Sequence, residues 1–152
     1  MIYNNSEIDK FIIYLKPNQP ILGIDFGERL IGIAKTDRSR FLSNPYAVIK
    51  GPGFDDISTI VLKEKICGIV IGYPLSMDGT EGENCKKVNK YSAELLKRFN
   101  LPIYLQDERL TTKAAKAVLK DSHLSRKEKD FLDNKIAASI ILESFLDFAK
   151  NR

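Results

Sequence analysis

The sequence predicts an α/β domain built on a mixed five-stranded sheet with helices on both faces. Three observations predict it: two β-rich runs joined by a tight turn at Gly27 and Glu28, a nearly continuous apolar run at 66–74, and amphipathic helical spacing on either side of that run. At roughly 150 residues per domain, a chain of 152 residues suits one compact unit. The predicted order is β-β-β-α-β-α-β-α, preceded by an additional N-terminal helix.

Each element follows from its local pattern. A short helix at 6–15, with Ser6 as its cap, forms an N-terminal extension over 1–19, and the main domain is expected over 20–152. The β-rich runs and helical spacings then give the remaining order: a hairpin over 20–37, a strand at 45–50, a helix at 55–65, a strand at 66–74, a longer helix with Val88, Tyr91, Leu95 and Phe99 on one stripe, a strand at 101–106, a helix capped by Thr111 and a last helix from about 129 to 150.

Composition excludes several classes of protein. A 43% hydrophobic and 29% charged chain can bury a core, so general disorder is excluded. No apolar run approaches the roughly 18 residues that cross a bilayer. The two cysteines, Cys67 and Cys85, lack the spacing of a metal or redox motif, and the acidic residues Glu7 and Asp9 argue against a secretory signal. We therefore expect a cytoplasmic protein with no membrane partner and with reduced cysteines.

The positive charge is concentrated in one stretch. The chain carries 24 basic and 20 acidic residues, a net charge of +4. Residues 109–129 contain seven basic and two acidic side chains, a local charge of +5, so the rest of the chain sums to −1. Such a stretch favours a polyanion as partner, although a solvated helix face with a basic loop explains it equally well.

Acidic residues lie where predicted strands end. Asp25 ends a buried strand, and Asp107 and Glu108 directly follow another. Asp133 lies on the apolar face of the last helix, where a solvated aspartate is not expected. Each has an ordinary explanation, because Asp25 can cap a turn and the adjacent acids can serve a helix dipole. Together they predict one pocket beyond the carboxyl ends of the strands.

The chemistry of that pocket follows from its ligands. Carboxylates with no nearby His or Cys select Mg²⁺ or Mn²⁺, and paired ions of this kind hydrolyse phosphodiesters. If the strands of Asp25 and Glu108 flank a third strand, their axes are about 10 Å apart. Glu108 must then reach across, and Gly72 leaves room because it has no side chain. The loop from Gly72 through Pro74 to Gly79 can aim its amides at a phosphate, or can be a plain turn.

Four segments resemble one known family. They are GIDFGERLIGIAKTD, GYPLSMDGTEGE, QDERLTTKAA and LDNKIAASIILESFLDF, and they span about residues 20–148. Their order and spacing are similar to the YqgF family of pre-16S rRNA nucleases, also called Holliday junction resolvase-like, which have a ribonuclease H-like fold. The resemblance implies that Asp25, Glu108 and Asp133 are the catalytic and metal-binding residues.

Further positions are candidates for contacting substrate or supporting the metal ligands. They come from the family motifs and from the basic stretch: Asp107, Arg109, Thr111, Thr112, Gly72, Pro74, Gly79, Arg29, Lys113 and Lys116. The sequence departs from the family in one respect, since Leu30 follows Arg29 where a second basic residue is common. The N-terminal helix also extends beyond the usual start of the family.

Three functions remain open at this point. The first is a metal-dependent endonuclease that acts on structured RNA, as a monomer or weak homodimer, and that processes the 5′ end of pre-16S rRNA. The second is a resolvase of DNA junctions, which calls for a dimer with two sites. The third is an RNA-binding domain without catalysis, in which the three acids are spread apart or paired with basic side chains. We favour structured RNA over junction DNA.

Overall fold

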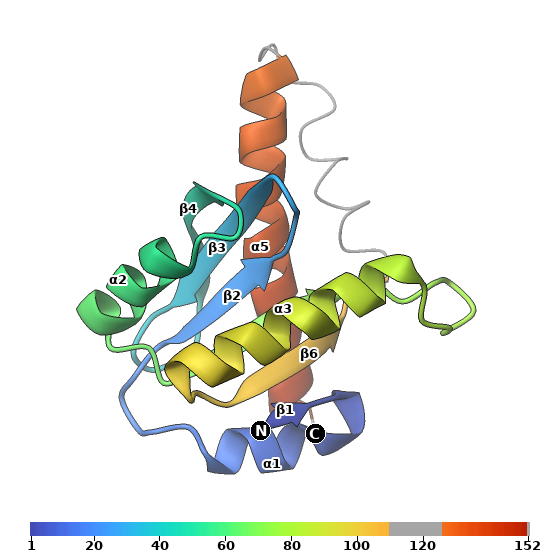
Figure 1. Cartoon of the computed structure of the whole chain (residues 1–152). Coiled ribbons are helices and arrows are strands. Elements are labelled where there is room, and N and C mark those ends of the chain that lie inside the picture. Colours follow the sequence, from blue (N-terminus) through green and yellow to red (C-terminus); the bar gives the residue numbers. More distant parts are fainter. Residues whose placement is uncertain (110–125, 152) are drawn as a thin grey trace.

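The computed structural model describes the backbone of residues 1–109 and 126–151, and the side chains of these residues except 126–132. The strands are β1 (Ile2–Tyr3), β2 (Ile21–Asp25), β3 (Leu30–Thr36), β4 (Ser43–Lys50), β5 (Gly68–Tyr73) and β6 (Ile103–Asp107). The helical elements are the 3₁₀ turn η1 (Asn5–Glu7), α1 (Ile8–Ile13), α2 (Phe54–Glu64), α3 (Glu83–Phe99) and α5 (Arg126–Lys150), labelled in Figure 1 where there is room. The helix predicted after Thr111 lies outside the described residues.

The strands form one mixed sheet in the order β1-β6-β5-β2-β3-β4. The segment β2-β3-β4 is an antiparallel meander, whereas β5 and β6 run parallel to β2. The predicted fold class is therefore confirmed. The predicted number of strands was wrong by one, because Ile2 and Tyr3 pair in parallel with Ile103 and Tyr104 and add a sixth strand.

The N-terminal helix differs in detail from its prediction. It is divided into η1 and the shorter α1, and its cap is Asn4 rather than Ser6. The Asn4 side chain accepts a hydrogen bond from the Ser6 backbone N–H at 3.0 Å, and the Glu7 side chain accepts one from the Asn4 backbone N–H at 3.2 Å, which makes a capping box. Phe11 of α1 is fully buried, so the segment packs onto the sheet.

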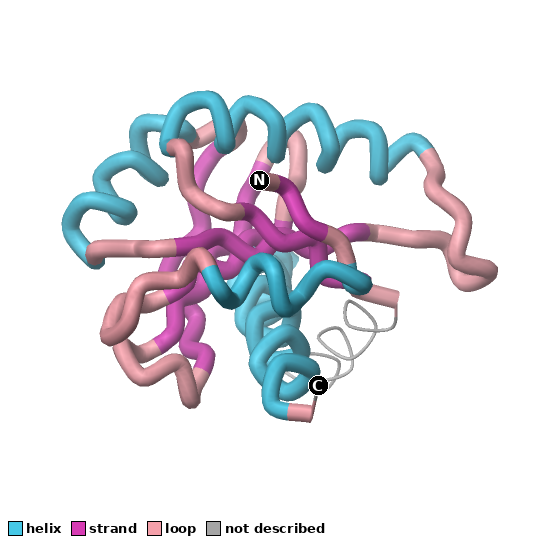
Figure 2. Tube along the Cα trace, turned by 90° about the horizontal axis from the view of Figure 1, so that it is seen from below, coloured by secondary structure: helices cyan, strands magenta, loops and turns pink. Residues whose placement is uncertain are grey.

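The helices cover the sheet from two sides. Helices α2 and α3 pack on one face and α5 on the other, as the two views in Figures 1 and 2 show. Alternation along the strands explains this, because Ile69 and Ile71 of β5 face the first layer whereas Val70 faces α5. Among the described residues, no helix combines the length and the hydropathy needed to span a bilayer.

Gly32 of β3 brings α5 very close to the sheet. A Cβ added at Gly32 would overlap the backbone carbonyl of Asn134 in α5 and lie 3.4 Å from the Ala138 methyl. Because a helix backbone cannot rotate away as a side chain can, we expect Gly32→Ala to lower the free energy of unfolding by about 1–3 kcal/mol. Urea unfolding measures the change. Gly82→Ala is the control, since a Cβ there meets no atom within 4 Å, and equal stability of the two variants would contradict this packing.

Candidate active site

The three predicted acids converge at the carboxyl ends of the central strands. Asp25 ends β2, and Glu108 follows β6, which lies on the other side of β5. Asp133 comes from α5, the helix that packs on the face of the sheet opposite α2 and α3. Asp25 is subject to the charges of both Glu108 and Asp133, and one carboxylate oxygen each of Glu108 and Asp133 is buried from solvent. The structure thus gathers three carboxylates from distant parts of the chain.

Gly72 makes this convergence possible. It lies in β5, between the strands that lead to Asp25 and Glu108. A Cβ at Gly72 would lie 2.5 Å from Glu108 Oε2 and 2.6 Å from Ile141 Cδ1, so the Glu108 carboxylate occupies the space that any side chain would fill. The Glu108 backbone N–H donates to the Tyr73 carbonyl at 3.1 Å, which anchors the residue beside β5. The reach of Glu108 across β5 is confirmed.

The electrostatics of the site favour a bound cation. Burial, and then the charges of Glu108 and Asp133, raise the pKa of Asp25 to about 7. Burial, and then the charge of Asp107, raise the pKa of Glu108 to about 7. The shifts reflect burial first and neighbouring negative charge second, and a divalent cation beside these groups would stabilise their charged forms.

The chemistry of the donors fits Mg²⁺ or Mn²⁺. Carboxylate oxygens are the ligands that these hard ions prefer, and the three acids offer no nitrogen or sulfur donor. Within residues 1–109 and 126–151, no three Asp, Glu, His or Cys side chains lie where they could hold a metal ion as they stand. Like charges repel when no cation lies between them, so we regard the acids as a set of candidate ligands that a cation would draw together.

These pKa shifts predict how the stability of the metal-free protein depends on pH. Asp25 and Glu108 hold their protons up to about pH 7 when folded, but release them near 3.8 and 4.5 when unfolded. Between about pH 4 and 7 the folded state binds more protons, so the free energy of unfolding falls as pH rises, by about 2–4 kcal/mol. Thermal unfolding in EDTA measures this, and Asp25→Asn should flatten the dependence. A wild-type slope in that variant would contradict the assignment.

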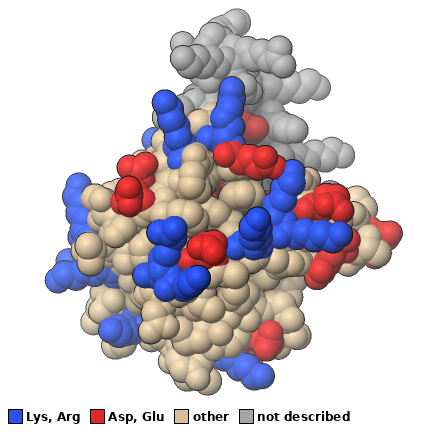
Figure 3. All heavy atoms as spheres, in the orientation of Figure 1, with Lys and Arg blue, Asp and Glu red and all other residues tan. Residues whose placement is uncertain are grey.

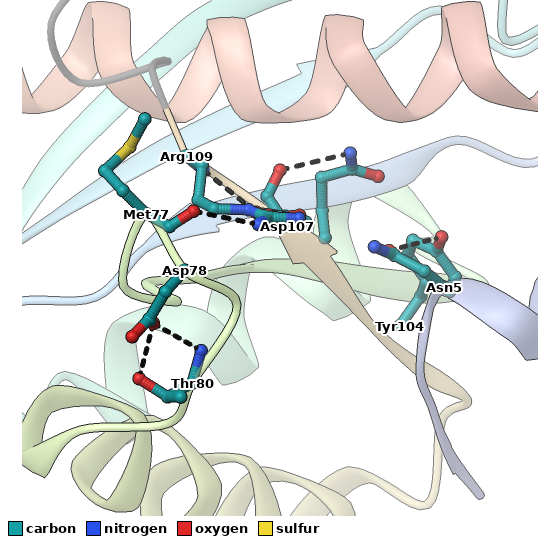
Figure 4. A network of polar contacts seen from close by, with 8 residues as sticks. Asn5, Met77, Asp78, Thr80, Tyr104, Asp107 and Arg109 are labelled. Atoms are coloured by element: carbon teal, nitrogen blue, oxygen red, sulfur yellow. Dashed lines mark hydrogen bonds and ion pairs between the residues drawn. The ribbon is translucent and has the colours of Figure 1, made fainter.

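Asp107 and Arg109 form an ion pair beside the site rather than joining it. The Arg109 guanidinium donates to Asp107 Oδ2 from Nη2 at 2.6 Å and from Nε at 2.9 Å, and it donates to the Met77 carbonyl at 3.4 Å (Figure 4). Burial alone would raise the pKa of Asp107, but hydrogen bonds and charge from Arg109 hold it below its usual value. Arg109 therefore ties the end of β6 to the glycine-rich loop.

The glycine-rich loop uses several of its amides internally. The Gly79 N–H donates to the Ser76 carbonyl at 2.8 Å, and the Ser76 N–H donates to the Thr80 carbonyl at 2.9 Å. The Thr80 N–H donates to Asp78 Oδ1 at 2.9 Å. Gly79 has φ of +88°, which requires a glycine in this turn. For these amides the structure supports the turn interpretation over the phosphate cradle.

A cavity of about 460 Å³ adjoins the acidic site. Glu108 and Pro74 line it, so a ligand in the cavity would lie against one of the three acids. Its other walls come from the β2–β3 turn and the first turns of α3: Phe26, Gly27, Glu28, Asn84, Lys87 and Val88. Lys87 and Glu28 form an ion pair there. Its volume is within the range of small-molecule sites.

The positions of the remaining predicted residues say little about the site. Thr111, Thr112, Lys113 and Lys116 lie outside the described residues. Arg29 is exposed next to the β2–β3 turn, and its carbonyl accepts a hydrogen bond from Gly51 N–H at 3.0 Å. On the face seen in Figure 3, Lys and Arg side chains alternate with Asp and Glu, so that face carries no field of one sign.

Sequence comparison finds similar proteins along almost the whole chain. Residues 19–148 match the family model RuvX, described as Holliday junction resolvase. A protein of Rickettsia peacockii (strain Rustic) named "Putative pre-16S rRNA nuclease" is 42% identical over 155 residues, which cover 99% of both chains. A protein of the same name from Rickettsia bellii (strain OSU 85-389) is 44% identical over 97% of both chains.

Solved structures are more distantly similar. T. thermophilus RuvC in complex with Holliday junction substrate has a TM-score of 0.46 and 12% identity, covering 88% of this chain and 96% of that chain. A yeast mitochondrial Holliday junction resolvase has a TM-score of 0.45 and 13% identity, covering 97% of this chain and 88% of the other. Likeness at this level carries no information about the substrate.

Proposed function

Because the chain belongs to the RuvX family, whose members include YqgF proteins, we propose that it is a metal-dependent endonuclease that processes the 5′ end of pre-16S rRNA. Its six-stranded mixed sheet is the ribonuclease H-like architecture that the family resemblance implied. The observation that carries the proposal is the Glu108 carboxylate lying over Gly72, on the path from β6 toward Asp25. The family match from residue 19 supports a nuclease domain over 20–152 with an extension over 1–19.

We assign the metal-binding role to Asp25, Glu108 and Asp133. When bound there, Mg²⁺ or Mn²⁺ would activate water and stabilise the leaving oxygen of a phosphodiester. The three acids must be ionised to bind a cation, so the raised pKa values of Asp25 and Glu108 make cation affinity increase toward pH 8. Gly72 leaves the space that the Glu108 carboxylate occupies, and the Asp107–Arg109 ion pair holds the glycine-rich loop beside the end of β6.

We also propose how the chain holds its substrate. Nucleic-acid backbones are bound mainly by Lys and Arg, with an affinity that falls steeply with salt. Lys113, Lys116 and Arg29 are our candidates for this role, with Thr111 and Thr112 as polar contacts beside them. A role in rRNA maturation places the protein in the cytoplasm.

Cleavage of junction DNA is the second candidate activity, because the matching family model is described as Holliday junction resolvase. A four-way junction has two symmetric strands to cut, which calls for a dimer with two sites, whereas an rRNA end requires one. The names of the Rickettsia relatives favour RNA.

A competition assay tests both activities. Purified protein is incubated with a labelled pre-16S rRNA fragment and a labelled four-way junction, each with Mg²⁺, Mn²⁺ or EDTA. We expect cleavage of the RNA at a defined 5′ position, dependent on metal, by a species that sedimentation shows to be a monomer or weak dimer. Preferred cleavage of the junction by a stable dimer would favour the second activity, and binding to RNA without cleavage under any condition would favour a non-catalytic domain.

A further inference from the structure

A second cavity of about 460 Å³ lies next to the acidic site, at the open edge of β6. Its lining residues come from the N-terminal segment, the glycine-rich loop and the end of β6: Asn5, Met77, Gln106, Asp107 and Arg109. Figure 4 labels four of them, Asn5, Met77, Asp107 and Arg109. Strand β1 pairs with β6 only as far as Tyr104, so the edge is uncovered where the cavity begins. Gln106 is the register partner of Gly72, the residue over which Glu108 lies. Neighbouring strands are about 4.8 Å apart, so the cavity begins one strand away from the Glu108 carboxylate.

Gln106 is the unusual residue of this cavity. It is only 8% exposed, and its Nε2 donates to the Asp107 carbonyl at 3.4 Å. Its Oε1 is fully buried, and no described residue donates a hydrogen bond to it. Buried acceptors are almost always satisfied in folded proteins, because an unsatisfied one loses its hydration without compensation. The Gln106 side chain lines the cavity while its Oε1 is shielded from solvent, so a rotation of the amide would bring this unsatisfied acceptor to a ligand with an N–H donor.

Asn5, which also lines the cavity, supplies a donor. Asn5 Oδ1 accepts a hydrogen bond from the Tyr104 hydroxyl at 3.0 Å, which fixes the orientation of the amide. Among the described residues, none accepts a hydrogen bond from Asn5 Nδ2, so this N–H₂ group is available to a ligand. The cavity thus offers one amide acceptor and one amide donor, the pair that protein side chains use to read the edge of a nucleobase.

The charges of the cavity favour a neutral ligand. Arg109 is its cation, but the two hydrogen bonds to Asp107 Oδ2 neutralise it, and the same contacts occupy Asp107. A phosphate would meet no uncompensated positive charge, and a divalent cation would have to displace Arg109. The guanidinium is held in one plane by Asp107 and by the Met77 carbonyl, and a planar guanidinium is a surface on which bases stack.

We propose that this cavity, the Asn5–Gln106 pocket, binds an unpaired base of the substrate strand close to the cleaved phosphate. The proposal rests on the proposed nuclease function, which supplies the strand. It also gives the N-terminal extension a role, because Asn5 is its contribution to the pocket. The base would be recognised by Gln106 Oε1 and Asn5 Nδ2 and would stack against Arg109.

A scan with abasic nucleotides tests the proposal. Labelled pre-16S rRNA fragments, each lacking one base near the cleavage site, are titrated in Mg²⁺ in the Asp25→Asn background, where the strand stays intact. We expect one position at which loss of the base weakens binding about three- to tenfold. Gln106→Met, of similar size but without the acceptor, should weaken binding of the intact RNA to the same extent and show no further loss at that position. Gln19→Met, which changes the other glutamine of the chain, should behave as the parent.

Two further measurements separate the alternatives. Asn5→Asp keeps the oxygen that accepts from Tyr104 but removes the Nδ2 donor, and it should also abolish the dependence on that base. Gln106→Met should raise the melting temperature by a few degrees, because it removes an unsatisfied buried acceptor. A scan with no sensitive position would overturn the pocket, and so would a sensitive position that persists in Gln106→Met. The pocket would also be overturned if free nucleoside monophosphates competed with the RNA for binding while the scan showed no sensitive position. Failure of the nuclease function itself shows separately, as absence of metal-dependent cleavage by the wild-type protein.

Discussion

Asp25→Asn is expected to reduce metal-dependent cleavage by about a thousandfold or more while leaving the fold intact. The change removes one of three partly buried carboxylates that we assign to cation binding, at the end of the central strand β2. Asparagine has nearly the same shape, so the packing is retained. Loss of one like charge among buried carboxylates should also make the variant more stable than the wild type at pH 8 in EDTA.

Single-turnover cleavage and thermal unfolding on the same preparation measure both effects. Asp147→Asn is the matched control, because Asp147 is exposed on the far part of α5, the helix that also carries Asp133. This control should cleave as the wild type does. Cleavage by Asp25→Asn at the wild-type rate would show that the activity arises elsewhere, and a variant that lost both activity and stability would contradict the charge argument.

Gly72→Ala is expected to lower cleavage by about a hundredfold with a smaller loss of stability. The added methyl would take the space now filled by Glu108 Oε2 and Ile141 Cδ1, which lie 2.5 and 2.6 Å from the Cβ position. Ile141 is packed in the core, whereas the Glu108 side chain can rotate toward solvent. We therefore expect Glu108 to leave the site, which separates it from Asp25 and weakens cation binding.

Stabilisation by cations distinguishes displacement of Glu108 in Gly72→Ala from a general packing defect. Wild-type protein should melt at a higher temperature when Mg²⁺ or Mn²⁺ is added at pH 8, and Gly72→Ala should lose most of that increase. Gly82→Ala should keep both the increase and the activity, since a Cβ at Gly82 meets no atom within 4 Å. An unchanged response to cations in Gly72→Ala would mean that Glu108 does not take part in binding them.

The part of the site that could be predicted depends on local sequence patterns. Asp25 and Glu108 directly follow apolar β-rich runs, and Asp133 interrupts the apolar face of a helix, so strand ends and helical periodicity predict their meeting place. The role of Gly72 was also predictable, because a missing side chain on the intervening strand was the geometric condition for Glu108 to reach across.

The features that escaped prediction depend on contacts between distant segments. Strand β1 has two residues, too few for any periodicity, and it exists because Ile2 and Tyr3 pair with β6 a hundred positions later. The Asn5–Gln106 pocket joins the same two regions, and although Gln106 begins the QDERLTTKAA segment, no sequence pattern links it to Asn5. The pairing of Arg109 is another such feature, because two neighbouring acids precede it and only the turn after β6 selects Asp107.

The short strand β1 has a consequence for the solubility of the protein. Without it, β6 would form an outer margin of the sheet, and its backbone N–H and C=O groups would be a template for strands of other molecules. The Ile103 N–H donates to the Met1 carbonyl at 2.9 Å, so even the first residue shields that margin. Two residues of strand thus protect the part of this margin at Ile103 and Tyr104 against aggregation.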